Sequence, residues 1–323
     1  MAKMNARMMR TKMALEVAAE LYTQRMFTMG NVATISIQPS SREEQFPGIT
    51  MGINGDLMGG MKAPIEVGAR RIEVAFINPS AIVTMAYRGK GFYKEKLPLR
   101  ALASFPSWDK MALAVAKDLK LKSLFEIGER KIPLRISTRS SGVYNTTYYT
   151  VTKILSLYGM SFSKIKSWGG SVHETPRPTS PQRLDGIRTG KVNAIFDEGL
   201  HNWLDDALDH GFEILPIEPR VVRQLSALGY QSSVIPCAKF RHLKADVNTI
   251  DFSGWPLITH RGLSSDLAYS ICQAIDLRQN VIPVDDDGPL DMRKICRGTE
   301  AAAPLGIPLH PGAKRYYEEK GYL

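Results

Sequence analysis

Cysteine is scarce in this chain, which has only Cys237, Cys272 and Cys296 among its 323 residues. An odd number of cysteines at wide spacing builds neither a disulfide framework nor a C-x-x-C metal or redox pair from sequence neighbours. We therefore expect the three thiols to act as small buried hydrophobic side chains.

Long apolar runs are missing as well. No stretch approaches the roughly 20 consecutive apolar residues of a membrane-spanning helix, so we expect no direct membrane insertion. Apolar residues between Met1 and Phe27 recur near helical spacing with charges between them, which predicts an amphipathic helix. Glu16, Glu20 and Arg25 interrupt the apolar run of a secretory signal. The sequence as it stands indicates a cytoplasmic protein, and a periplasmic one if the true start lies upstream.

The common fingerprints of cofactor, metal and hydrolase sites are also missing. Neither G-x-G-x-x-G, nor a P-loop, nor a G-x-S-x-G elbow is present, and the six histidines form no H-E-x-x-H or i, i+4 pair. We expect no metal and no cofactor.

Positive charge exceeds negative charge, because 42 Lys and Arg stand against 32 Asp and Glu, for a formal net charge of +10. Such a field attracts anions. The cations are spread along the chain, and no basic run, helix-turn-helix pattern or RNA-binding aromatic motif accompanies them. We therefore expect an anionic partner, such as a small carboxylate or a phosphate, and no nucleic acid.

Short β-rich runs alternate with helical stretches, which is typical of an α/β protein with a mostly parallel sheet covered by helices. Strands are predicted at Thr34–Gln38, Ile49–Ile53, Glu73–Ile77, Leu99–Ala103, Met111–Ala116, Ile132–Thr138, Val192–Phe196 and Glu213–Ile217. Helices are predicted at Val143–Tyr158, around Leu200–His210 and at Asp266–Leu277. At about 150 residues per domain, the length indicates two domains.

Two loops stand out between these elements. Thr175–Gln182 holds three prolines in eight residues, so it is predicted to be a loop beside a cleft. Thr138-Arg139-Ser140-Ser141-Gly142 joins a predicted strand to a predicted helix, where hydroxyls, unpaired N–H groups and a guanidinium favour a carboxylate or phosphate. The alternative for the second loop is an ordinary serine cap beside a solvated arginine.

Two further strand ends carry short polar side chains. Asn78-Pro79-Ser80 follows one strand and Asp197-Glu198-Gly199 follows another, as a small-molecule cleft would need. Adjacent strand residues point to opposite faces, so at most one of Asp197 and Glu198 is expected to face the cleft. A helix cap beside a solvated carboxylate is the alternative for this pair.

Several longer segments together resemble a known family. They are the strand IPLRIST followed by Ser-Ser-Gly, then LDGIRTGKVNAIFDEG at Leu184–Gly199, and the closing IPLHPGAKRYYEEKGYL at Ile307–Leu323. GARRIEVAFINPSAIVTMAYRG at Gly68–Gly89 is similar to another step of the same family. The pattern resembles the TAXI-type solute-binding proteins of tripartite ATP-independent periplasmic (TRAP) transporters.

The resemblance implies a type II periplasmic-binding-protein fold, in which two α/β lobes close over a small ligand. Residues 1–104 together with 216–323 would form the first lobe, and residues 105–215 the second. The protein would bind a small carboxylate between them, as a solute-binding protein or an intracellular homologue, and a TRAP membrane permease is the implied partner if the chain is exported. The expected ligand-binding residues are Asn78, Ser80, Thr138, Arg139, Ser140, Ser141, Gly142, Asn145 and Asp197.

A cytosolic enzyme on the same scaffold is the alternative. It would be similar to a decarboxylase or desulfinase that acts on an aromatic or organic acid. Cys237 or His173 would then have to serve as nucleophile or acid/base. No recognisable catalytic constellation accompanies either residue, which favours the binding protein.

Overall fold

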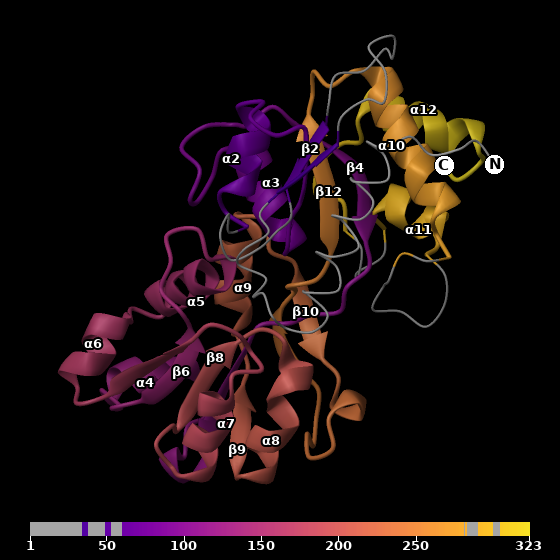
Figure 1. Ribbon diagram of the computed structural model, residues 1–323. Helices are drawn as coiled ribbons and strands as arrows, with labels where there is room; N and C mark the ends of the chain where they lie inside the picture. Colours follow the sequence, from indigo (N-terminus) through magenta and orange to yellow (C-terminus); the bar gives the residue numbers. More distant parts are fainter. Residues whose placement is uncertain (1–33, 38–48, 53–59, 281, 283–289, 300–303) are drawn as a thin grey trace, which may run out of the picture.

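The computed structural model describes residues 34–37, 49–52, 60–280, 282, 290–299 and 304–323 (Figure 1). The amphipathic helix predicted between Met1 and Phe27 lies outside these residues. Two mixed sheets, each covered by helices, form two halves of the molecule that we call the first and second lobes. The predicted α/β fold class with two lobes is thereby confirmed.

The first lobe is built on a sheet of strand order β1-β2-β3-β12-β4. Its strands are β1 (Thr34–Ile37), β2 (Ile49–Gly52), β3 (Val74–Phe76), β12 (Trp255–His260) and β4 (Leu99–Phe105). Its helices are α2 (Ala63–Gly68), α3 (Ser80–Arg88), α10 (Ser265–Leu277), α11 (Met292–Arg297) and α12 (Pro311–Glu319).

Alternation of side chains along the strands gives this sheet two apolar faces. Ala75 and Ile258 belong to the core cluster that includes α2 and α3, whereas Val74 and Leu257 belong to the cluster that includes α10, α11 and α12. The helices therefore lie on opposite sides of the sheet (Figure 1).

The second lobe has the strand order β7-β6-β8-β5-β9. Its strands are β5 (Ala112–Ala116), β6 (Arg135–Arg139), β7 (Ser171–Thr175), β8 (Ala194–Asp197) and β9 (Phe212–Leu215). Its helical segments are η2 (Lys117–Leu119), α4 (Leu124–Glu129), α5 (Thr146–Leu157), α6 (Phe162–Ser167), α7 (Pro181–Arg188), η3 (Leu200–Asn202) and α8 (Leu204–Asp209).

The chain crosses between the lobes along two neighbouring segments. Residues 106–111 lead from β4 to β5, and residues 251–254 lead back from β11 to β12. The two segments pair as an antiparallel bridge between Lys110 and Asp251, and the Phe252 N–H donates to the Asp109 carbonyl over 3.0 Å. We call residues 106–111 the crossing segment.

A third group of elements touches both lobes. It comprises α9 (Pro219–Ser226), η4 (Cys237–Lys239) and a hairpin of β10 (Ser232–Ile235) and β11 (Val247–Ile250). Leu225 of α9 packs in the cluster that contains α5, and Ile235 packs in the cluster of α7 and α8. Where a domain boundary falls in this stretch, or elsewhere in the chain, stays a prediction.

The sheets are mixed, so the expectation of a mostly parallel sheet is wrong. β5 runs antiparallel to both β8 and β9, and β12 runs antiparallel to both β3 and β4. A strand that returns from the other lobe enters the sheet from the opposite end, which produces this reversal. The alternation of apolar and polar residues along a strand, and its composition, do not indicate whether the neighbouring strand runs parallel or antiparallel to it.

Most of the predicted elements form within a few residues of their expected bounds. The sequence reading missed β7 and β12, and it missed the β10–β11 hairpin. α5 ends at Leu157, and Gly159 just beyond it has a φ of 71°, the left-handed conformation that commonly follows a helix end. Cys272 and Cys296 are buried as predicted, whereas Cys237 is only half-buried.

Among the helices of the described residues, none combines the length and the apolar character needed to cross a bilayer.

Candidate functional site

A cavity of about 930 Å³ lies between the two lobes. The first lobe contributes Asn78 and Trp255, and the crossing segment contributes Trp108 and Asp109. The second lobe supplies most of the wall, from three places that follow the carboxyl ends of β6, β7 and β8. Open α/β sheets commonly bind ligands at such strand ends.

The longest part of this wall is the loop from β6 to α5. The Asn145 side chain caps α5 by accepting the Tyr148 N–H over 2.9 Å, so the helix begins at the cavity. Because the first N–H groups of a helix have no intrahelical partner, its N-terminus carries partial positive charge. Ser140, Thr146 and Thr147 add hydroxyls to the same wall. The Ser141 hydroxyl is already engaged, because it donates to Glu174 over 2.9 Å.

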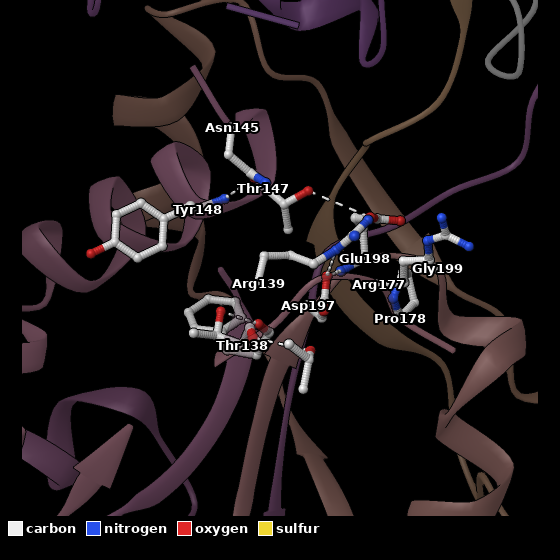
Figure 2. A network of polar contacts seen from close by, with 12 residues as sticks. Thr138, Arg139, Asn145, Thr147, Tyr148, Arg177, Pro178, Asp197, Glu198 and Gly199 are labelled. Atoms are coloured by element: carbon white, nitrogen blue, oxygen red, sulfur yellow. Dashed lines mark hydrogen bonds and ion pairs between the residues drawn. The ribbon is translucent and has the colours of Figure 1, made fainter. Parts of the chain in front are cut away.

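Arg139, at the end of β6, is held by the protein itself (Figure 2). Its Nε donates to Asp197 Oδ1 over 3.2 Å, its Nη1 donates to the Pro176 carbonyl over 2.7 Å, and its Nη2 pairs with Glu198. Burial disfavours its charged form, but the two carboxylates outweigh burial and raise the pKa of Arg139. Its positive charge is therefore matched without a ligand.

Asp197 lies behind this wall. Its carboxylate is fully buried and accepts from both Arg139 and Arg183. Arg183 is also fully buried, and it is held by Ser137 Oγ at 3.1 Å and Thr175 Oγ1 at 2.8 Å. The pair fixes the ends of β6, β7 and β8 against α7.

Glu198, one residue further, turns toward the cavity and lies beside Asp109 of the crossing segment. The Thr147 hydroxyl approaches Glu198 Oε1 at 3.4 Å, and the carboxyl groups of Glu198 and Asp109 are hydrogen-bonded. Burial and the Glu198 charge raise the pKa of Asp109 well above its usual range. Burial also acts to raise the pKa of Glu198, but Arg139 and the hydrogen bond from Asp109 outweigh it and lower that pKa.

Two other cations on the cavity wall, unlike Arg139, are not paired with a carboxylate of the described residues. Arg177 and Lys239 both line the cavity, and within the described part of the chain neither forms an ion pair with a carboxylate. Lys239 Nζ lies 4.9 Å from the centroid of the Trp108 ring, a cation–π contact that orients the ammonium without neutralising it. Trp108 in turn packs against His201, with ring centroids 4.8 Å apart.

A family model, described as the NMT1-like family, matches residues 50–321 of this chain. The chain belongs to the NMT1-like family. Three solved structures are similar to this NMT1-like protein at low identity. PhnD1 from Prochlorococcus marinus, in complex with methylphosphonate, is 9% identical over 82% of this chain and 84% of its own, with a TM-score of 0.40.

The other two structures match over shorter stretches. The glycine betaine/L-proline-binding protein ProX from Borrelia burgdorferi is 12% identical over 64% of each chain, with a TM-score of 0.37. The periplasmic aliphatic sulphonate binding protein SsuA from Escherichia coli is 10% identical over 67% of this chain and 54% of its own, with a TM-score of 0.34. The NMT1-like chain thus spans less than two thirds of the length of these two proteins.

The structure brings many of the sequence-predicted residues of this NMT1-like protein to one cavity. Those that line it are Asn78, Arg139, Ser140, Ser141, Gly142 and Asn145. Ser80, Thr138 and Asp197 are buried beside it and are not part of its lining. Thr138 uses its hydroxyl to join β6 to β8 by donating to the Phe196 carbonyl over 2.9 Å. Of the adjacent carboxylates Asp197 and Glu198, only Glu198 lines the cavity, as strand alternation predicts.

Other lining residues were missed by sequence reasoning. Trp108 and Asp109 of the crossing segment and Lys239 of η4 carry no motif, and only the folded chain brings them to the cavity. Arg177 carried a usable signal, because it lies in the proline-rich loop that was expected beside the cleft, and residues 176–179 of that loop line the cavity.

The two residues considered for an enzyme lie elsewhere. His173 sits on β7 with its Nε2 2.9 Å from Ser171 Oγ, and Cys237 accompanies Asp246 near the β10–β11 hairpin. Neither lines the cavity. The geometry does not favour the enzyme on this scaffold.

Proposed function

We propose that this NMT1-like protein is a solute-binding protein whose interlobe cavity holds a small organic anion, with a carboxylate as its acid group. The charge pattern of the wall carries the proposal. Arg139 and Arg183 are matched by Asp197 and Glu198, while Arg177 and Lys239 remain as cations without a carboxylate among the described residues. A cavity with surplus positive charge attracts and retains anions.

The neutral donors of the wall support the same ligand class. The N-terminus of α5 and the hydroxyls of Ser140 and Thr146 lie on one side of the cavity. Such donors suit the oxygen atoms of a carboxylate, because hydrogen bonds to an ionised acceptor are stronger than neutral ones. Trp108 and Trp255 give the cavity apolar surface for the rest of the molecule.

A thermal-shift screen with mono- and dicarboxylates, including benzoate and succinate, tests the proposal. An anion that binds only the native protein raises the unfolding temperature, and the rise grows with the logarithm of its concentration above the Kd. We expect stabilisation by at least one carboxylate, and recovery of that compound unchanged after prolonged incubation. Consumption of the compound would instead indicate an enzyme, and a screen without any stabilising anion would contradict the proposal.

The finer assignment is that the protein works as a TAXI-type receptor for a TRAP membrane permease. It is supported by the sequence segments that resemble TAXI proteins, with Ser140-Ser141-Gly142 at the cavity. This role requires a periplasmic location, whereas a cytoplasmic location would make the protein an intracellular ligand-binding homologue. Fractionation of cells that express the native gene, with detection of the protein in the periplasmic extract, decides between the two.

A further inference from the structure

The carboxyl pair of Asp109 and Glu198 is the least expected feature of a cavity that attracts anions. Asp109 comes from the crossing segment and Glu198 from the end of β8, so their contact ties the crossing to the second lobe. Asp109 Oδ1 also accepts the Gly199 N–H over 2.8 Å and the Lys110 N–H over 2.8 Å. Both N–H groups fall on the same carboxyl oxygen, so neither is bonded to Asp109 Oδ2.

The cations around this pair do not balance it. Arg139 and Arg183 carry two positive charges, while Asp197, Glu198 and Asp109 offer three carboxyl groups. The cluster therefore carries one negative charge too many if every carboxyl ionises.

Two other cations near Asp109 have contacts of their own, whereas Arg177 lines the same cavity without a carboxylate partner among the described residues. The Lys110 ammonium pairs with Asp251 of the second crossing and donates to Ser253 Oγ over 3.1 Å. Lys239 faces the Trp108 ring from η4. No cation in the described part of the chain is paired with the Asp109 carboxyl.

We propose that Asp109 holds a proton when the cavity holds its anion, so that the protein binds an acid as anion and proton together. The inference rests on the proposed function. The proton comes from water and resides on the Asp109 oxygen that faces Glu198, where it is donated in a hydrogen bond to the Glu198 carboxylate. Loss of this proton places a second negative charge beside Glu198 and on the wall that the anion approaches, which weakens binding.

The energetics of the free protein point the same way. Burial and Glu198 raise the pKa of Asp109 and outweigh the N–H groups of Gly199 and Lys110, which lower it. At pH values between the pKa of the unfolded chain and this raised pKa, the folded protein therefore holds a proton that the unfolded chain has lost. Stability attributable to this group therefore falls as pH rises from about 4 toward the raised pKa. A bound anion raises that pKa further, and binding takes up a proton wherever Asp109 is partly ionised.

Isothermal titration calorimetry of benzoate and succinate, in buffers of different ionisation enthalpy, tests the proposal. Above the pKa of Asp109, we expect uptake that approaches one proton per anion and a Kd that rises about tenfold per pH unit, the slope of one linked proton. The variant Asp109→Asn keeps the donor to Glu198 and should bind without uptake or this pH dependence. Asp118→Asn, an exposed acid on η2, is the matched control and should behave as wild type.

A second readout needs no ligand and separates the two proposals. Isotope-edited infrared spectra of aspartate-labelled protein at neutral pH should show a protonated carboxyl that disappears in Asp109→Asn and weakens in Glu198→Gln. Spectra of the anion-bound protein that show an ionised Asp109 would overturn the proton inference alone. A protonated Asp109 with no binding of either anion would overturn the proposed function and the inference with it. Equal proton uptake in wild type and Asp109→Asn would also overturn the inference.

Discussion

At the scale of single residues, the cavity contains two kinds of cation. Arg139 is engaged by Asp197, Glu198 and a backbone carbonyl, and it organises the wall. Arg177 and Lys239 line the same wall without a carboxylate partner in the described residues. A ligand anion can gain binding energy from the second kind, because no carboxylate of the described residues neutralises these cations.

This distinction predicts different outcomes for two sets of substitutions. Arg177→Gln and Lys239→Gln should each weaken carboxylate binding by about tenfold, equivalent to about 1.4 kcal/mol, with little change in unfolding temperature. Lys166→Gln, an exposed residue of α6 outside the cavity lining, is the control and should leave the Kd unchanged. Titration calorimetry measures all three. Unchanged affinity in both cavity variants would remove these cations from the ligand site.

The residue scale also shows where sequence reasoning stops. A strand-to-helix loop with Ser, Gly and Asn is recognisable from local pattern, and it does line the cavity. The same pattern cannot predict that Arg139 pairs with Asp197 and Glu198, because those carboxylates lie 58 and 59 positions away in the chain. Asp109 and Lys239 lack any local signal, since only tertiary contacts bring them to the wall.

At the scale of elements, the two crossings between the lobes are joined by buried polar contacts. The Lys110 and Asp251 side chains are 5% and 7% exposed, and they pair beside Ser253. The Thr249 hydroxyl donates to the Met111 carbonyl nearby. These contacts fix how the crossing segment lies against residues 251–254, and thereby place Trp108 and Asp109 in the cavity.

Breaking this pair should be costly. Asp251→Asn leaves the Lys110 ammonium buried without its counter-ion, and we expect a loss of about 3–5 kcal/mol in the free energy of unfolding. Asp206→Asn removes one partner of an exposed pair with Arg188 and should cost less than about 1 kcal/mol. Urea unfolding followed by circular dichroism measures both. Equal, small losses would show that the crossing is held by its backbone contacts alone.

Elements differ in how readily the sequence predicts them. α5 is anticipated well, because Val151, Leu155 and Tyr158 recur at steps of four and three and Gly159 follows the last of them. β12 is missed although it pairs with a strand on each side, because a short apolar run without alternation resembles a buried helix segment as much as a strand. The antiparallel direction of β5 and β12 is missed for a different reason. It arises because each of these strands enters its sheet from the other lobe.

At the scale of the whole molecule, two sheets and two crossings place the ends of β6, β7 and β8 opposite the first lobe. The cavity between them combines surplus cations, the N-terminus of α5 and two tryptophans. The chain belongs to the NMT1-like family, and the proposal of an organic acid as its ligand depends on this lining. The fold class could be predicted from alternating elements, whereas the charge balance of the cavity required the folded structure.

The most direct test of this account compares an acid with its neutral isostere. Benzoate and benzamide have nearly the same size and the same ring, and they differ in charge at the group that would meet Arg177, Lys239 and the α5 N-terminus. Titration calorimetry at one pH and low salt should detect binding of benzoate with at least a tenfold lower Kd than benzamide, and added salt should narrow the difference. Equal binding of the two compounds, or preference for benzamide, would contradict the claim that the cavity recognises an anion.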